Sequence, residues 1–152
     1  AVPRCLRPGL AQVQDTVLIC PPRLIQRAAL AALQVGPAWV QARVALLRER
    51  RLLLLETISK AQRHGLPIDV PIVPDGAFYA LLACSTPLPG EALVERLVRD
   101  HGVVTLPGEA FGMAPSDGTS WLRLSYGMLE SPQLEVALDR LLQGLGVLCQ
   151  PC

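Results

Sequence analysis

Residues 102–127 read GVVTLPGEAFGMAPSDGTSWLRLSYG, and they hold the most informative pattern of this chain. The segment contains a short apolar run, a loop in which Gly108 and Gly112 permit tight turns, and a second apolar run that includes Arg123. A charged side chain within an apolar strand needs a partner, because burying an unpaired charge costs free energy. No carboxylate lies nearby on the same strand. The partner of Arg123 is therefore either a distant acidic residue or the anion of a ligand.

The composition limits the possible functions. A chain of 152 residues that is 51% hydrophobic is long enough for one domain with a sizeable core. The net charge of +1 offers no basic surface for nucleic acid or an anionic membrane, and no apolar run approaches the roughly 20 residues of a membrane span. Five cysteines without a secretory signal favour a reducing cytoplasm. Because the chain begins with Ala rather than Met, we expect a piece of a longer protein.

The hydrophobic periodicity predicts alternating helices and strands. Apolar residues recur at three-or-four spacing along a long helix that we place at residues 38–64, and Ser131 is the expected N-cap of the last helix. The other predicted helices cover residues 23–35, 91–100 and 133–145, and the predicted strands cover residues 68–73, 77–84, 103–106 and 121–126. This order predicts an α+β fold, in which a small, mostly antiparallel sheet is covered by helices.

Five segments together resemble the C-terminal part of class I/II aminotransferases, the fold-type I enzymes that use pyridoxal 5′-phosphate. They are QDTVLICPPR at residues 14–23, the long arginine-bearing helix, PDGAFY at residues 74–79, GVVTLPGEAFG at residues 102–112 and WLRLS at residues 121–125. The resemblance covers residues 13–144. It implies the C-terminal domain of an enzyme that is α/β as a whole, with a long interdomain helix.

The resemblance gives Arg123 a role, because in the family the arginine of the last strand pairs with the α-carboxylate of the substrate. A guanidinium has two parallel N–H donors that fit a carboxylate and fix its orientation. A structural ion pair with one of the thirteen acidic residues is the alternative. Phe78 resembles a family residue near the substrate side chain, although ordinary strand packing explains it equally well. No metal site is expected, because Cys149 and Cys152 lack two further ligands.

The family's catalyst is a lysine that forms a Schiff base with the cofactor. The one lysine of this chain, Lys60, follows the QDT segment, whereas the family's lysine precedes it. We therefore interpret Lys60 as a solvent-exposed helix residue. The resemblance implies that the catalytic lysine lies upstream of Ala1, that pyridoxal 5′-phosphate is bound mainly there, and that the present chain is inactive alone.

The intact protein is thus expected to be a cytoplasmic, homodimeric aminotransferase that moves an amino group from an amino acid to a 2-oxo acid, with neither nucleic acid nor membrane as a partner. Residues 1–37 would end the large cofactor-binding domain, residues 38–146 would form the connecting helix and the small domain, and residues 147–152 would be a tail. Three alternatives stay open: another fold-type I enzyme such as a C–S lyase or a decarboxylase, a non-catalytic regulator with an aminotransferase-like domain, and a stand-alone interaction module.

Overall fold

The computed structural model describes residues 2–114, 116 and 118–149, and the chain divides into two compact units at residues 42 and 43. The first unit contains the short helix η1 (Arg4–Leu6), α1 (Arg7–Val17), α2 (Arg23–Val35) and the first turns of α3 (Pro37–Arg63). None of its described residues is buried. The helix α2 has the predicted bounds, whereas α1 was not predicted. No single described helix is long and apolar enough to cross a membrane, and α2 and α3 pass that test only as a bent pair, by length and composition.

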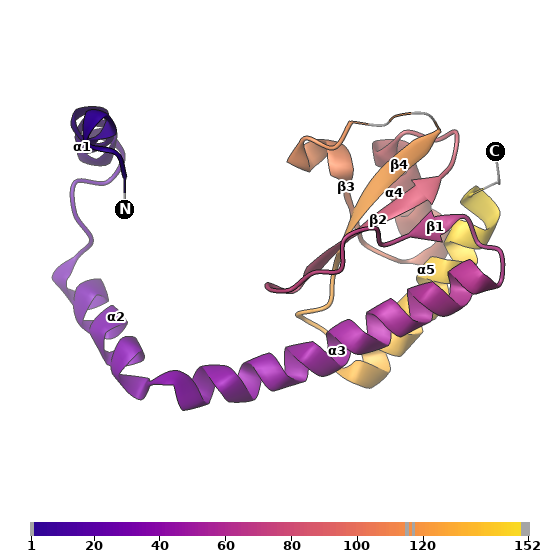
Figure 1. Ribbon diagram of the computed structural model, residues 1–152, viewed down its shortest axis with the longest axis horizontal. Helices are drawn as coiled ribbons and strands as arrows, with labels where there is room; N and C mark the ends of the chain where they lie inside the picture. The colour runs from indigo at the N-terminus through magenta and orange to yellow at the C-terminus, as the bar shows by residue number, and fades with distance from the viewer. Residues whose placement is uncertain (1, 115, 117, 150–152) are drawn as a thin grey trace. The chain divides into compact units, whose positions relative to one another are not determined.

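The second unit is built on a four-stranded sheet in which every pair of neighbours is antiparallel (Figure 1). The strand order is β1-β2-β4-β3, so the two long strands lie in the middle. The strands are β1 (Ile68–Asp69), β2 (Tyr79–Ser85), β3 (Leu106–Pro107) and β4 (Thr119–Ser125), and the helices that complete the unit are α4 (Gly90–His101), η2 (Gly108–Phe111) and α5 (Ser131–Leu148). The predicted antiparallel sheet with helical cover is confirmed.

The two faces of the sheet differ in burial. Along β2 and β4 every second side chain is buried, including Leu82, Cys84 and Leu122, each with no exposed surface. These side chains pack against leucines of α4 and α5 and against Leu54 and Ile58 of α3, which form one core. The opposite face carries side chains that are only half-buried. Among the described residues of the second unit, the helices therefore cover one face of the sheet and leave the other open (Figure 1).

Two predicted strands are shorter than the pattern suggested. The strand expected at residues 68–73 pairs only at Ile68 and Asp69, because Pro71 and Pro74 have no N–H to donate to a ladder. The strand expected at residues 103–106 pairs only at Leu106 and Pro107. The loop that follows contains the 3₁₀ helix η2.

The helix ends show how local chemistry fixes the boundaries. The long helix α3 ends one residue earlier than predicted, and α5 continues three residues beyond its predicted end. The predicted N-cap of α5, Ser131, is wrong. Glu130 is the cap, and its side chain and that of Gln133 form a reciprocal capping box.

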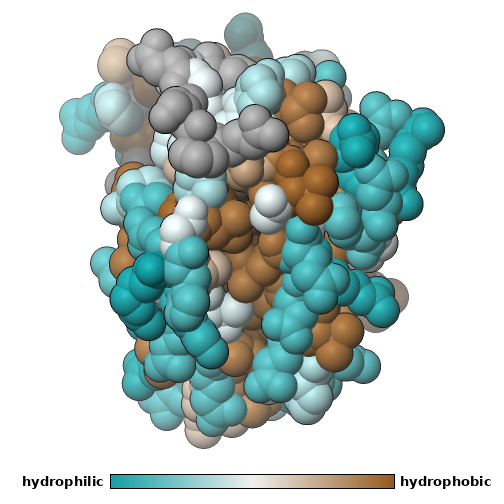
Figure 2. Space-filling view, turned by 90° about the vertical axis from the view of Figure 1, so that its right-hand side faces the viewer, coloured by the Kyte–Doolittle hydropathy of each residue, from teal (hydrophilic) through white to brown (hydrophobic). Residues whose placement is uncertain are grey.

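Viewed from the side where α5 ends, the surface shows hydrophilic bands with apolar side chains between them (Figure 2).

Candidate functional site

Arg123 lies on the open face of the sheet, in β4, which is one of the two central strands. Its backbone pairs with Leu81 of β2 and with Leu106 of β3, so hydrogen-bonded strands flank it. Its side chain is half-buried. The prediction of a charged residue within an apolar strand is confirmed, and the sheet fixes the point from which its side chain emerges.

Two aromatic rings contact the guanidinium of Arg123. Its Cζ lies 4.3 Å from the centroid of the Tyr79 ring and 4.2 Å from that of Phe111. Such cation–π contacts attract the charge without using the N–H donors. Within the part of the chain that the structure describes, Arg123 has no ion pair and no hydrogen bond. No described acid therefore pairs with Arg123 or occupies its N–H donors.

The position of Phe111 depends on how η2 is attached. Gly108 sits so close to β4 that a Cβ built on it would lie 2.4 Å from the Cβ of Trp121. Glu109 accepts a hydrogen bond of 2.8 Å at Oε1 from the backbone N–H of Gly90, at the positive N-terminus of α4. Gly112 ends η2 in the left-handed conformation, with φ of 79°. The loop is therefore fixed to both a strand and a helix.

Phe78 lies beside Tyr79, and the Tyr79 ring separates it from the guanidinium of Arg123. Its ring centroid is 4.3 Å from that of Tyr79, and the two rings are tilted by 45°. The ring also lies against Gly127, where a Cβ would come within 2.8 Å of it. Phe78 is exposed, and the residue before it, Ala77, has a positive φ of 57°. Phe78, Tyr79, Arg123 and Phe111 thus form a continuous row.

The other candidate residues lie apart from this row. Lys60 is exposed on α3, as predicted, beside Glu56 and Arg63. No group of three or more His, Cys, Asp or Glu among the described residues could hold a metal ion. Cys152, the second cysteine of the CxxC pattern, lies outside the described residues.

Cys149 instead interacts with Cys84 inside the core. The hydrogen bond between the two thiols and burial together raise the pKa of Cys84, and the same hydrogen bond lowers the pKa of Cys149. No local pattern indicates this pairing, because β2 and α5 bring the two residues together from far apart in the chain.

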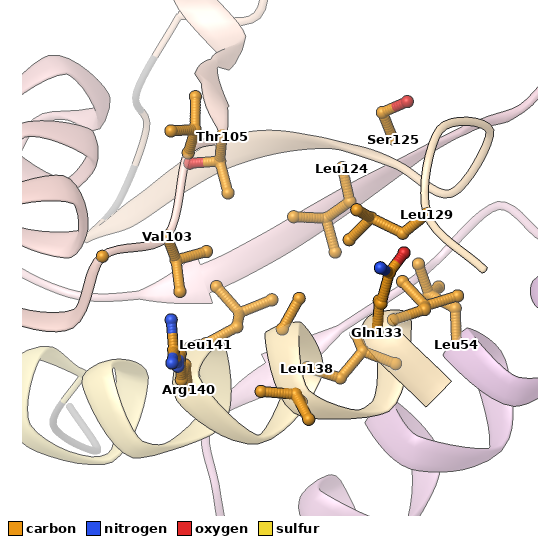
Figure 3. A pocket seen from close by; sticks show the side chains of 15 residues that line it. Leu54, Val103, Thr105, Leu124, Ser125, Leu129, Gln133, Leu138, Arg140 and Leu141 are labelled. Atoms are coloured by element: carbon orange, nitrogen blue, oxygen red, sulfur yellow. The ribbon is translucent and has the colours of Figure 1, made fainter. Parts of the chain in front are cut away.

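A cavity of about 350 Å³ lies on the helical side of the unit, between α5, the end of β4 and residues 102–105 (Figure 3). Gln133 rises from α5 into this space below Leu124, and Arg140 lies near Val103. Thr105 also lines the cavity, and its hydroxyl is buried without a hydrogen-bond partner among the described residues. Most of the lining is aliphatic, and Arg123 is not part of it. The cavity is therefore separate from the arginine site.

The model of the family "Aminotransferase class I and II" matches residues 2–141, which is almost the whole chain. The chain belongs to this family. An aspartate aminotransferase of Rhizobium meliloti is 30% identical over 150 residues, covering 91% of this chain and 34% of that protein.

Solved aminotransferase structures match the fold. The aromatic aminotransferase from Pyrococcus horikoshii superposes with a TM-score of 0.70 at 29% identity, covering 90% of this chain and 34% of that one. LysN, an α-aminoadipate aminotransferase from Thermus thermophilus solved with N-(5'-phosphopyridoxyl)-L-leucine, superposes with a TM-score of 0.76 at 24% identity, covering 97% of this chain and 36% of that one. The small sheet and its helices match the C-terminal domain of fold-type I aminotransferases.

This aminotransferase chain spans only about a third of the length of the curated relatives it matches. The resemblance inferred from the sequence is confirmed at the level of the family.

Proposed function

We propose that the whole protein is a pyridoxal 5′-phosphate-dependent aminotransferase that moves an amino group from an amino acid to a 2-oxo acid, and that Arg123 binds the α-carboxylate of the substrate. One observation carries the assignment: a half-buried guanidinium on the open face of the sheet has no anionic partner among the described residues. Its donors fit a carboxylate in a two-point contact, which fixes the orientation of an amino acid as well as its charge.

We propose that the described residues do not by themselves form the site for the cofactor. The only lysine, Lys60, is exposed on α3 and belongs to a different surface from the Arg123 row. We therefore propose that the lysine that bonds to the cofactor, and most of the groups that hold it, lie upstream of Ala1. On this proposal the chain supplies a carboxylate contact and one wall of the substrate site, and it is inactive by itself.

The first unit supports a division into domains. Its helices α1 and α2 bury no residue, and large apolar side chains such as Ile19 and Leu33 are more than three-quarters exposed. Exposed apolar surface of this kind marks an interface. We propose that residues 1–37 complete the large cofactor-binding domain, that residues 38–146 are the connecting helix and the small domain, and that residues 147–152 are a tail. The protein would act as a cytoplasmic homodimer.

Phe78 is proposed to contact the side chain of the substrate. The support is its position: it is exposed, and the ring of Tyr79 lies between it and Arg123 in the row described above. A ligand held at the guanidinium would extend along this row. An apolar side chain would then gain contact with the Phe78 ring.

The test compares this chain with a version extended upstream through the expected lysine, both incubated with pyridoxal 5′-phosphate and desalted. We expect an absorbance band that borohydride reduces in the extended version only. In that version Arg123→Lys should raise the KM for the amino acid about 10- to 100-fold, the range given by losing a charged two-point hydrogen bond. Arg96→Lys, at an exposed arginine of α4, is the matched control and should leave KM unchanged.

Other outcomes would reject the proposal. An adduct at Lys60 in the short chain would place the chemistry elsewhere. Ammonia release without a new amino acid would indicate a lyase, and the absence of a band in both versions would indicate a non-catalytic relative. An unchanged KM in the Arg123→Lys variant would remove the carboxylate role from Arg123.

A further inference from the structure

We propose that Tyr79 and Phe111 are positioning residues that hold the guanidinium of Arg123 between them, so that its N–H edge is presented to the substrate carboxylate. The proposal rests on the carboxylate role of Arg123. It adds the means by which a long, flexible side chain is oriented without an acidic partner. The observations that carry it are the two ring contacts, at 4.3 Å and 4.2 Å from Cζ, and the absence of any competing ion pair among the described residues.

The two rings reach Arg123 from opposite sides of its strand. Tyr79 belongs to β2, and Phe111 belongs to η2, which directly follows β3. Because β2 and β3 flank β4, the charge is approached from both neighbours. The sheet register supports the first contact: Tyr79 pairs with Ser125, so it lies diagonal to Arg123 on the same face.

Rings suit this task better than a carboxylate would. An acidic partner would occupy the N–H donors, and a substrate would have to displace it. A ring face attracts the positive charge but accepts no strong hydrogen bond from it, so the donors stay available. An arginine side chain that is already ordered also loses less conformational entropy when the ligand binds. The rings should therefore increase affinity for the carboxylate.

Each ring is held by its own contacts. Tyr79 stands in a paired strand and is backed by Phe78. Phe111 is held by η2, which Gly108 brings against Trp121. These supports are what a positioning role requires, because a mobile ring could not orient the charge.

The test uses the extended protein loaded with cofactor and measures the dissociation constant of propanoate, a carboxylate that cannot react. Propanamide, its uncharged analogue, reports contacts that do not involve the charge. We expect Tyr79→Leu and Phe111→Leu each to weaken propanoate binding about tenfold, with no change for propanamide. Tyr79→Phe and Phe111→Tyr keep the ring and should stay within about twofold of the parent protein.

The outcomes separate the two levels of the proposal. If Arg123→Lys weakens propanoate binding but the folded leucine variants bind it as tightly as the parent, the ring contacts are structural and the positioning role is refuted. If Arg123→Lys also leaves propanoate binding unchanged, the carboxylate role itself fails, and the positioning role fails with it. Where a leucine variant does not fold, the methionine variant at the same position is measured instead, because methionine is close to leucine in volume. If that variant binds propanoate as tightly as the parent protein, the positioning role is refuted.

Discussion

Replacing Gly108 by alanine tests how closely the loop must approach the sheet. The new Cβ would lie 2.4 Å from the Cβ of Trp121, 3.0 Å from the Cβ of Met113 and 3.2 Å from the carbonyl oxygen of Trp121. These atoms cannot move aside like the end of a long side chain, because Trp121 pairs with β2 as part of β4. The loop must therefore move away from the strand. Overpacking of this kind costs about 1–3 kcal/mol.

The assay is thermal or denaturant unfolding of the variant beside its parent. For a unit the size of residues 43–152, the expected cost lowers Tm by roughly 5–15 °C. Gly146→Ala is the matched control, since a Cβ there meets nothing within 4 Å and its φ is not positive. Gly146 lies in the last turn of α5, so that exchange should leave the stability unchanged or raise it by up to about 0.5 kcal/mol. A Gly108→Ala variant as stable as its parent would refute the close approach.

Three further predictions concern Glu109, Cys84 and Tyr126 of the second unit. Glu109→Ala should lower the free energy of unfolding by about 1 kcal/mol, because the N–H of Gly90 loses its acceptor, and Glu109→Gln should cost less; chemical denaturation measures both. Cys84 should react with a thiol reagent only at the rate of unfolding, whereas the exposed Cys5 should react at once; time-resolved labelling with mass spectrometry separates them. Burial raises the pKa of Tyr126, so the folded state favours its protonated form. The stabilisation should be complete below about pH 10, the usual pKa of a tyrosine, and decline as the pH rises beyond it. Tyr126→Phe should remove this dependence in denaturation measured across that range.

The elements that could be predicted from the sequence are those whose signals are local. Apolar spacing identified the long helix within a residue at each end. The strand at residues 68–73 was overestimated because its apolar residues outweighed Pro71 within it. The capping of α4 by Glu109 could not be predicted, since the donor and acceptor are 19 residues apart and only the tertiary fold brings them together.

The residues of the candidate site also differ in whether the sequence alone could identify them. Arg123 was identified because a charge within an apolar strand is anomalous on sequence alone, and the surrounding motifs gave it a role. Its ring partners were not identified. Phe111 sits in a segment that sequence patterns describe only as a glycine-rich loop, and Tyr79 was noted only as part of the PDGAFY segment at residues 74–79. Which aromatic faces the charge depends on strand register and on the attachment of η2, and neither can be obtained from periodicity.

One explanation accounts for both the unpaired guanidinium of the second unit and the exposed apolar side chains of the first unit. In the second unit the guanidinium of Arg123 has no anionic partner among the described residues. The face of the sheet that carries Arg123 is open, whereas the other face of the sheet is densely packed. In the first unit two amphipathic helices bury none of their apolar side chains. Burial of apolar surface and pairing of charge are the ordinary outcomes of folding. Where both are incomplete in a chain about a third as long as its relatives, the simplest physical explanation is that the surfaces and the anion that complete them come from outside these residues.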